Sequence, residues 1–514
     1  MSSCRISAAD TPSFDPSQQR EDEDQSHPTD KPAARTAPSR RGALDRYFHI
    51  SERGSTIGTE VRAGVVTFFA MAYIIVLNPL ILGTTTDVNG VSLGVPQVAA
   101  ATALAAGVMT IAFGLIARYP FGIAAGLGIN TMLAVTLVAG EGLSWPEAMG
   151  LVVVDGVVIV ILAVSGFREA VFNAIPAPMK AAIGVGIGAF IAMIGLVDAG
   201  FVTRVPDEAN TTVPVSLGSG GSIATLPTLV FVIGLIICGA LVVRNVRGGL
   251  FIGIVATTVI AMIAEAIFSP GSAAENAGGW ALAVPKIPDS LGGLPDLSIV
   301  GDVDPIGAFA HVGGLAATLL VFTLVLANFF DAMGTMTALG KQAGLSDKEG
   351  NLPDLKKALV VEGTGAIVGG VCSASSNTVF ADSAAGIGDG ARTGLANVVT
   401  GLIFLAAMFL TPLYEVVPIE AAAPVLVIVG AMMMSQVTDI PWAKFDIALP
   451  AFLTIVVMPY TYSIANGIGV GFIMFTLMAV ARGKAREVHW IMWLVSALFL
   501  VYFGVDPIMA AIGR

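Results

Sequence analysis

The chain has 514 residues, of which 55% are hydrophobic and only 12% are charged, and its formal net charge is −11. A soluble globular domain carries about 25% charged residues, so this composition argues against an ordinary soluble enzyme. The negative charge also argues against nucleic acid as a partner. Apolar runs of about 20 residues, long enough to cross a hydrocarbon core as helices, indicate instead a polytopic membrane protein surrounded by lipid.

Residues 1–42 differ from the rest of the chain. They are rich in Ser, Pro, Asp, Arg and Gln and contain few large apolar side chains. A segment of this composition cannot bury enough apolar surface to offset the entropy lost on ordering. We therefore predict a disordered tail, and the distribution of positive charge along the chain places this tail in the cytoplasm.

Fourteen apolar segments follow the tail. They are 64–82, 98–117, 121–139, 148–165, 175–197, 224–243, 248–268, 309–339, 358–371, 378–390, 394–411, 421–435, 446–463 and 466–481. Segments 121–139, 358–371 and 378–390 are short or interrupted by glycine, which is tolerated at membrane depth only where freed backbone groups face protein or a water-filled cavity. A further stretch, 488–510, has an unbroken apolar part of about 15 residues, and the sequence leaves open whether it spans the membrane or lies at its interface.

Positive charge alternates between the two sides of these segments. With the N-terminus inside, fourteen positive residues fall in cytoplasmic loops: Arg118, Arg168, Lys180, Arg244, Arg247, Lys341, Lys348, Lys356, Lys357, Arg392, Lys444, Arg482, Lys484 and Arg486. Only Arg204 and Lys286 fall in the opposite loops, although these include the two longest, 198–223 and 269–308. Since short cytoplasmic loops carry the excess of Lys and Arg, this pattern predicts fourteen spans in the cell membrane with a cytoplasmic N-terminus.

The fourteen spans divide into two sets of seven, which then have opposite orientations in the membrane. Matching spans share local signals: Ala177-Pro178 opens span five and Ala423-Pro424 opens span twelve. Spans three and ten, which have the same place in each half, are both interrupted. Paired broken segments are the sequence sign of a transporter's binding site near the membrane midplane. We therefore predict an all-α membrane fold with a seven-plus-seven inverted repeat.

Two aspartates lie well inside apolar segments. Asp331 is far from either end of span eight, and Asp382 follows a stretch of span ten, 377–380, that is expected to be extended. A charged side chain at the centre of a membrane helix costs about 2.5–3.5 kcal/mol, which favours a functional role over a carboxylate that only joins helices. Asp382 and Ser383 are expected to start a short helix, whose free N–H groups and dipole would stabilise the aspartate.

Other polar positions are weaker candidates. Asp155 in span four and Glu362 in span nine are expected near the membrane surfaces, where solvation accounts for them as well as function does. In span three, Asn130 and Thr131 are expected to cap the half-helix that follows them. The alternative for this glycine-rich segment is an ordinary helix contact through small residues.

The sequence contains no Walker motif, zinc-ligand spacing or nucleophile elbow. Its three cysteines, Cys4, Cys238 and Cys372, are too few and too scattered for a disulfide framework or a metal site. We therefore expect a transporter rather than an enzyme, without a metal or organic cofactor, whose concentrative work comes from an ion gradient.

Four ordered motifs resemble the AzgA-like branch of the nucleobase–cation symporter-2 family, the hypoxanthine, guanine and adenine permeases. The motifs are FFAMAYIIVLNP (68–79), GLGIN (126–130), NFFDAMGT (328–335) and ARTGL (391–395). The resemblance extends from about Leu44 to Gly504 and does not cover the tail.

The resemblance implies the fold of the uracil and xanthine permeases, in which a core domain moves against a gate domain. The implied ranges are 43–166 (spans 1–4) and 309–412 (spans 8–11) for the core, 167–270 (spans 5–7) and 413–486 (spans 12–14) for the gate, and 487–514 for a C-terminal apolar or interfacial segment. Spans three and ten would each contribute a short strand and a half-helix. The resemblance also suggests a homodimer formed through the gate domain.

The resemblance places the substrate between spans three, eight and ten. The span-eight acid of the family falls on Asp331, its span-three asparagine on Asn130 and its span-ten acid on Asp382. Relatives usually carry glutamate at the last of these positions, and the shorter aspartate leaves the exact base preference open.

The chemistry of a purine suits these residues. One carboxylate can accept the N1–H and the amino group of guanine side by side. Phe380 and either Phe329 or Phe330 are candidate stacking surfaces, although a Phe in a membrane helix is more often a packing residue. Ser383 and Thr131 complete the candidate substrate-binding set.

The favoured hypothesis is that the protein is a proton-coupled importer of guanine, hypoxanthine or adenine, in which Asp331 and Asp382 couple proton binding to substrate binding. Desolvation favours the neutral form of a carboxyl group, so a buried acid can take up and release a proton as a cavity closes and opens. A sodium gradient is left open as the driving force. The alternatives are a xanthine or uracil permease of the same fold and an inorganic-anion transporter of related architecture, for which positive charge at the midplane is expected.

Overall fold

The computed structural model describes residues 42–166, 174–204, 215–218, 221–273, 275–276, 278–281, 283–287, 290, 292–345, 352–413 and 416–504. Residues Leu44–Arg514 form one compact unit. Apart from Gly42, the predicted disordered tail (1–42) lies outside the described residues, as does the end of the last apolar stretch.

Each of the fourteen predicted apolar segments contains a helix. Within the described residues, eight helical stretches are long and apolar enough to cross a membrane. They comprise α2 (Ile57–Met71) with α3 (Ile74–Leu82), α4 (Val95–Ile116), α6 (Trp145–Ser165), α8 (Ala177–Asp198), α9 (Leu226–Val243), α10 (Gly249–Phe268), α12 (Gly314–Gln342) and α16 (Ile419–Met433) with η3 (Met434–Asp439).

Shorter elements connect and complete these spans. The shorter helices are α1 (Ala43–Phe48), α11 (Gly307–His311), α13 (Leu355–Val371), α15 (Gly394–Ala407) with η2 (Met408–Leu413), α17 (Phe445–Tyr460), α18 (Ile464–Ala481), η4 (Ala485–Glu487) and α19 (Trp490–Phe503). Between α8 and α9, strands β2 (Val202–Arg204) and β3 (Val215–Leu217) form an antiparallel pair.

Spans three and ten are not continuous helices. In span three, strand β1 (Ile123–Ala125) leads into α5 (Leu127–Thr131), which continues as the π-helical stretch η1 (Met132–Gly140). In span ten, strand β4 (Asn377–Val379) leads into α14 (Ser383–Gly388). The predicted combination of a short strand and a half-helix is confirmed in both spans.

The two short strands pair with each other across the halves of the chain. The antiparallel register sets Ile123 opposite Val379, Ala124 opposite Thr378 and Ala125 opposite Asn377. Beyond the strands, the amide of Gly126 donates to the Ser376 carbonyl at 3.0 Å, and the amide of Phe380 donates to the Gly122 carbonyl at 2.9 Å. Unpaired backbone groups are costly at membrane depth, so this pairing is what allows both spans to be interrupted.

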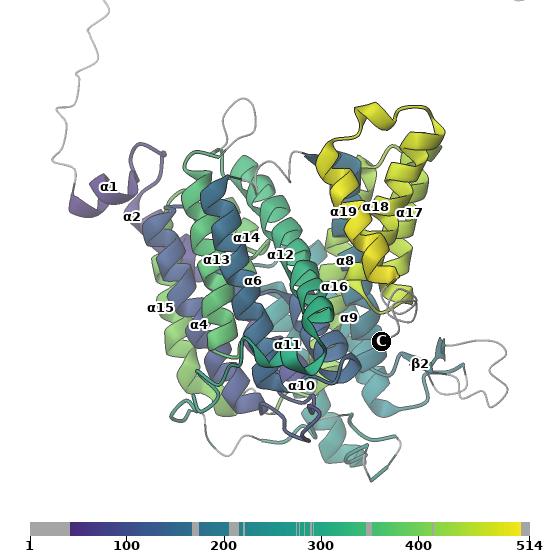
Figure 1. Ribbon diagram of the computed structural model, residues 1–514. Coiled ribbons are helices and arrows are strands. Elements are labelled where there is room, and N and C mark those ends of the chain that lie inside the picture. The colour runs from purple at the N-terminus through teal and green to yellow at the C-terminus, as the bar shows by residue number, and fades with distance from the viewer. Residues whose placement is uncertain are drawn as a thin grey trace, which may run out of the picture. The chain divides into compact units, whose positions relative to one another are not determined.

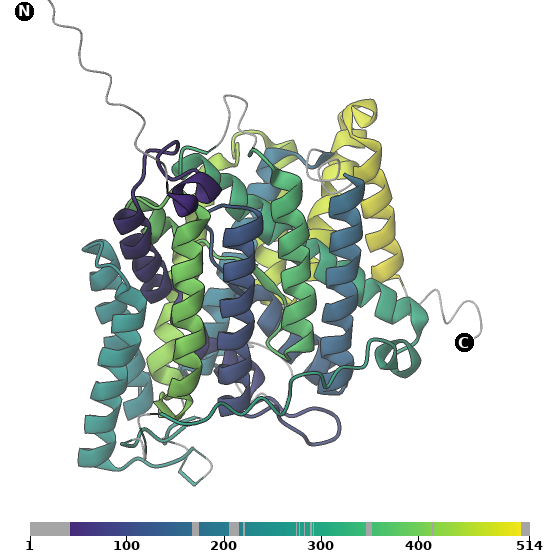
Figure 2. The same ribbon diagram turned by 90° about the vertical axis from the view of Figure 1, so that its left-hand side faces the viewer.

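Helix packing shows the inverted repeat directly. Helix α4 packs on α15, and their counterparts in the other half, α13 and α6, pack on each other. Likewise α9 packs on α10 and α16, as α17 packs on α18 and α8. Exchanging the two halves therefore maps these contacts onto one another, as an inverted repeat requires. Figure 2 shows α15, α4, α13 and α6 side by side, and in Figure 1 helices α17 and α18 stand at the other side of the bundle.

The chain thus has the predicted all-α membrane fold of fourteen segments in two inverted sets of seven. Helices α4 and α13 contact β1 and β4, and α15 and α6 pack on these two helices. Helices α9, α10, α17 and α18 pack around α8 and α16 and form a second group of contacts. The division into moving core and gate domains stays a prediction.

The predicted cap at Asn130 and Thr131 is wrong, whereas Asp382 and Ser383 do begin a short helix, as predicted. Helix α5 already begins after the extended residue Gly126, so Asn130 and Thr131 lie inside the helical stretch. The physical reason is that β1 leads directly into α5 without a loop in which Asn130 could act as the cap. Asp382 directly precedes α14, but its side chain makes no capping hydrogen bond to this helix. It accepts a hydrogen bond from the hydroxyl of Tyr73 instead.

The last apolar stretch contains α19, which packs against α18. A helix of 14 residues rises about 21 Å. This is less than the hydrocarbon thickness of about 30 Å, but α15, which also has 14 residues, belongs to one of the fourteen segments, so length alone does not separate α19 from them.

Glycines allow the backbones of the two halves to touch. Gly394, at the start of α15, lies against Gly114 of α4, and a Cβ on Gly394 would lie 2.6 Å from the carbonyl carbon of Gly114. In the same way, a Cβ on Gly188 of α8 would lie 2.8 Å from the Gly430 carbonyl oxygen of α16. Both helix pairs therefore require glycine where they are closest.

We predict that Gly394→Ala destabilises the fold by about 1–3 kcal/mol, because the new methyl group forces α15 away from α4. The measurement is the thermal unfolding midpoint of the purified protein in detergent. Gly58→Ala in α2 is the matched control, since its new Cβ meets no atom within 4 Å. Equal midpoints for the two variants would contradict this account of the packing.

Candidate functional site

A cavity with an empty volume of about 760 Å³ lies where β1 and β4 run into their half-helices. Its lining residues are Tyr73, Gly126, Leu127, Gly128, Ile129, Ile187, Ile191, Ala327, Asp331, Thr335, Thr378, Val379, Phe380, Ala381, Asp382, Val429, Met433, Gln436 and Ile464. Cavities that bind small organic ligands have volumes of about 300–1,000 Å³ and mainly apolar walls with a few polar groups. This cavity, which we call the central cavity, has such walls, but the part of it that a water molecule can enter, about 130 Å³, is smaller than that range.

Helix α12 places Asp331 on the wall of the central cavity. Ala327, Asp331 and Thr335 are four residues apart, so they share one face of the helix, and all three line the cavity. Thr378 of β4 lies in the same wall. The predicted position of Asp331 deep within a membrane helix is what brings a carboxylate to the middle of the bundle.

Asp382 enters the central cavity from span ten. It follows β4 and directly precedes α14, so the end of the strand fixes the position of its Cα atom beside the cavity. The hydroxyl of Tyr73 donates a hydrogen bond of 2.8 Å to Oδ2 of Asp382. A carboxylate has about four acceptor positions, so the group can accept further donors from a ligand.

Tyr73 is a site residue that the sequence reasoning did not single out. It lies at the interruption between α2 and α3, is 1% exposed, and lines the central cavity. Its ring centroid is 6.2 Å from that of Phe380, which also lines the cavity. The available signal was a lone tyrosine within the apolar run 68–79, whose hydroxyl needs a partner at membrane depth.

The other predicted site residues lie away from the cavity lining. Asn130 is fully buried, and within the described residues neither its side-chain nitrogen nor its oxygen has a hydrogen-bond partner. Thr131 donates to the Leu127 carbonyl at 3.2 Å. Ser383 accepts a hydrogen bond of 2.9 Å from the Gly122 amide and so joins α14 to the approach of β1.

Of the candidate stacking residues, the structure places one in the lining of the central cavity and one outside it. Phe380 lines the central cavity and is 6% exposed, whereas Phe329 is buried outside the lining. The side chain of Phe330 lies outside the described residues. Of the residues chosen from the sequence, the structure therefore brings Asp331, Asp382 and Phe380 together.

A buried polar network adjoins the site. The amide of Asn328, three residues before Asp331 in α12, donates to Asp155 Oδ2 at 3.3 Å and to the Ser376 hydroxyl at 2.8 Å. Asp155 and Glu362 are both fully buried, so their expected positions near the membrane surfaces are wrong, and solvation, one of the two explanations left open for them, does not apply. Packing of α6 and α13 against each other removes both carboxyl groups from water. The described residues contain no group of three or more His, Cys, Asp or Glu side chains suited to a metal ion.

A second cavity, with an empty volume of about 1430 Å³, extends from the central cavity to the side of the membrane on which α2 and α10 begin. The two cavities share the lining residues Ala381, Asp382, Val429, Met433 and Gln436. We call the second cavity the vestibule. Asp382 therefore faces a space that leads towards the side predicted to be cytoplasmic.

The solved structures that resemble this chain show its fold. The transmembrane domain of the cyanobacterial bicarbonate transporter BicA has a TM-score of 0.53 and 15% sequence identity, covering 82% of this chain and 96% of that one. The murine anion transporter Slc26a9 in the inward-facing state has a TM-score of 0.53 and 13% identity, covering 82% of this chain and 68% of that one. At these identities the likeness concerns the architecture alone.

Sequence comparison gives the family. The family model Xan_ur_permease, described as "Permease family", matches residues 58–470. The guanine/hypoxanthine permease PbuG of Bacillus subtilis is 37% identical over 467 residues, which are 90% of this chain and 99% of the relative. The adenine permease AdeP of Escherichia coli is 33% identical over 467 residues, which are 91% of this chain and 97% of the relative. The chain is therefore a multi-pass membrane transporter that belongs to the xanthine/uracil permease family.

Proposed function

We propose that this protein is a secondary active transporter that imports purine nucleobases, namely guanine, hypoxanthine or adenine, by proton symport with alternating access. The observation that carries the proposal is that two carboxylates from different halves of the chain, Asp331 and Asp382, line one cavity between the broken spans. The similarity to permeases named for guanine, hypoxanthine and adenine supports the choice of substrate.

The chemistry of the central cavity suits a purine. A guanine or hypoxanthine ring presents an N1–H donor, and guanine adds an amino group, which one carboxylate can accept side by side. The first residues of α5, which line the cavity, have N–H groups without intrahelical acceptors that suit ring acceptors such as O6 and N7. Phe380 offers an aromatic surface beside Asp382.

Two acidic groups also provide for proton coupling. One carboxylate can receive the base while the other takes up and releases a proton as the cavity is hydrated and closed. Both carboxylates would contact the base, and proton uptake by one of them would accompany its binding. A carboxyl group in a desolvated site favours its neutral form, so purine and proton would assist each other's binding.

Alternating access has a structural counterpart in the vestibule. The vestibule and the central cavity share Asp382, so the site is connected to the membrane side where α2 and α10 begin. The excess of Lys and Arg in the loops of that side assigns it to the cytoplasm. This conformation would then be the one that releases substrate into the cell. The proposal includes location in the cell membrane and, as the family suggests, dimerisation through the gate domain.

An anion transporter is the second candidate, because BicA and Slc26a9 share the fold. The charged residues in the described lining of the central cavity are Asp331 and Asp382, and both would repel an anion. A xanthine or uracil permease of the same fold remains the nearer alternative.

We predict that cells lacking their own purine uptake accumulate radiolabelled guanine when they produce this protein. Unlabelled hypoxanthine or adenine should compete, and a protonophore should abolish accumulation, while replacement of sodium by choline should not. Uptake that only xanthine or uracil inhibits would contradict the substrate assignment. Accumulation that requires sodium and survives the protonophore would contradict proton coupling.

We predict that Asp331→Asn weakens purine binding by about tenfold to a hundredfold, the range expected for losing a hydrogen bond to a charged group. The measurement is the KM for uptake, or guanine binding to the purified protein if uptake is lost. Asp302→Asn, in an exposed loop, is the control for loss of a negative charge. An Asp331→Asn variant with unchanged affinity and proton dependence would remove Asp331 from the site.

A further inference from the structure

We propose that Tyr73 is a positioning residue, which holds the carboxylate of Asp382 in the orientation that receives the substrate. This inference rests on the proposed function and adds to it a residue from span one. It is carried by one hydrogen bond between residues that are far apart in the sequence and share a single cavity.

The hydroxyl of Tyr73 is a hydrogen-bond donor that meets a carboxylate acceptor, Asp382. Tyr73 is 1% exposed, and its hydroxyl donates to Oδ2 of Asp382 at 2.8 Å. The ring is held by its place between α2 and α3 and by its contact with Phe380, at 6.2 Å between centroids. Because the ring of Tyr73 is held in place, its hydroxyl approaches the carboxylate of Asp382 from a fixed direction.

Within the described residues, the Asp382 carboxylate has one further donor besides Tyr73, its own backbone amide. Asp382 lies between the end of β4 and the start of α14, and it makes no capping hydrogen bond to the helix. Because Tyr73 donates to Oδ2, it occupies one acceptor position of this oxygen. A ligand N–H, or a proton taken up by the carboxyl group, then meets the acceptor positions that remain on Oδ1 and Oδ2. Tyr73 would thereby select which face of Asp382 the substrate meets.

Tyr73→Phe removes only the hydroxyl, so the aromatic packing is kept. We expect the KM for guanine uptake to rise about tenfold with Vmax nearly unchanged, since a charge-assisted hydrogen bond that organises the binding group is lost. The protein's abundance in the membrane and its thermal unfolding midpoint should equal those of the wild type. Tyr119→Phe is the matched control, because Tyr119 is also fully buried and its hydroxyl has no partner within the described residues.

The outcomes separate this inference from the proposed function. If the wild type takes up no purine, the proposed function fails. If the wild type does so and Tyr73→Phe keeps the KM of Tyr119→Phe, only the positioning role is overturned. A fall in the unfolding midpoint and abundance with unchanged KM would show a merely structural role and would also overturn it.

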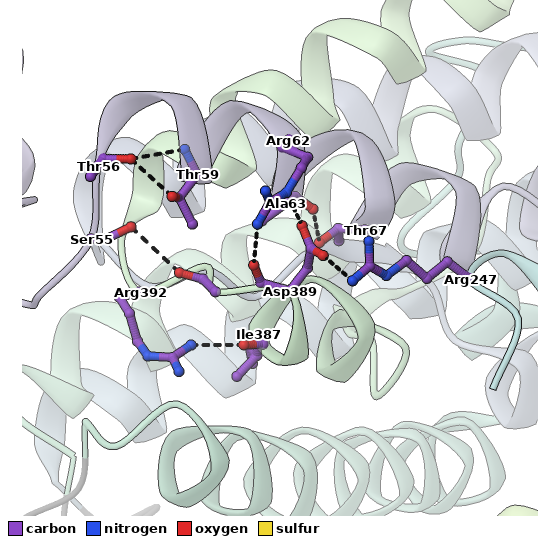
Figure 3. Close-up of polar contacts among 11 residues, drawn as sticks. Ser55, Thr56, Thr59, Arg62, Ala63, Thr67, Arg247, Ile387, Asp389 and Arg392 are labelled. Carbon is purple, nitrogen blue, oxygen red and sulfur yellow. Dashed lines mark hydrogen bonds and ion pairs between the residues drawn. The ribbon is translucent and has the colours of Figure 1, made fainter.

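A second, independent observation lies at the other end of α14. Asp389 directly follows this helix, and its side chain is 1% exposed. Arg62 of α2 donates from Nε to the Asp389 carboxylate at 2.6 Å and from Nη2 to the Asp389 carbonyl at 3.0 Å. Arg247, in the loop between α9 and α10, forms an ion pair with the same carboxylate. Figure 3 shows Asp389 between the two arginines.

We infer that the Arg247–Asp389 ion pair is a latch between the two groups of helices at the mouth of the vestibule. Arg62 and Asp389 belong to elements that pack with α15 and α12, whereas Arg247 belongs to the loop between α9 and α10, which pack with α16. Both Arg247 and Asp389 line the vestibule.

The latch is suited to opening. The side chain of Arg247 is 62% exposed, so water can solvate its charge when the pair with Asp389 opens. When Arg247 leaves, Asp389 keeps its two contacts with Arg62, so no buried charge is left unpaired. Since Asp382 and Asp389 flank the same short helix, release of the latch uncouples the segment that carries Asp382 from the loop between α9 and α10, while Arg62 still holds it to α2.

The test measures access to the vestibule and does not depend on substrate. In a chain with Cys4→Ser, we would introduce Ala385→Cys, which lies in the vestibule lining, and follow its labelling by a maleimide in membranes. Cys238 and Cys372 are buried and serve as background. We expect Arg247→Gln to increase the labelling rate several-fold, Arg247→Lys to restore most of the wild-type rate, and Arg244→Gln, in the same loop, to leave it unchanged. Equal rates for Arg247→Gln and Arg244→Gln would overturn the latch.

Discussion

Hydrogen bonding between β1 and β4 is the interaction on which the rest of this structure depends. A bilayer offers no water to satisfy an interrupted helix, so each broken span can exist only because its strand finds a partner. The partner comes from the equivalent span of the other half, in antiparallel register. This backbone pairing satisfies the hydrogen-bonding groups of both interrupted spans. It also joins the two halves of the chain at the centre of the membrane.

The candidate functional site lies at the ends of the paired strands. The chain emerges from β1 and β4 into half-helices, and the residues at these transitions face a cavity instead of a neighbouring helix. Asp382 lies at one transition, and α12 crosses beside it with Asp331. Helix α14 begins next to Asp382 and ends next to Asp389, so a single short helix connects the site carboxylate to an ion pair at the surface.

The architecture alone does not specify the cargo. Transporters of bicarbonate and other anions have the same fold at 13–15% identity. At the ends of its paired strands this chain presents carboxylates, a tyrosine and a phenylalanine. Electrostatics at that point favours ligands that donate hydrogen bonds over ligands that carry negative charge.

The sequence by itself determined the spans, the two inverted halves and the interrupted third and tenth segments, because hydrophobic length and charge alternation are set by the bilayer and are local properties of the chain. It also pointed to Asp331 and Asp382 as candidates, since polar groups are conspicuous in apolar segments, and to Phe380 as a candidate stacking surface. Only the tertiary structure decided that Asn130 and Ser383 lie outside the lining, that Asp155 is buried against Asn328, and that Tyr73 bonds Asp382. Those relations join side chains on different helices, and their distances follow from how the helices pack, which no local pattern encodes.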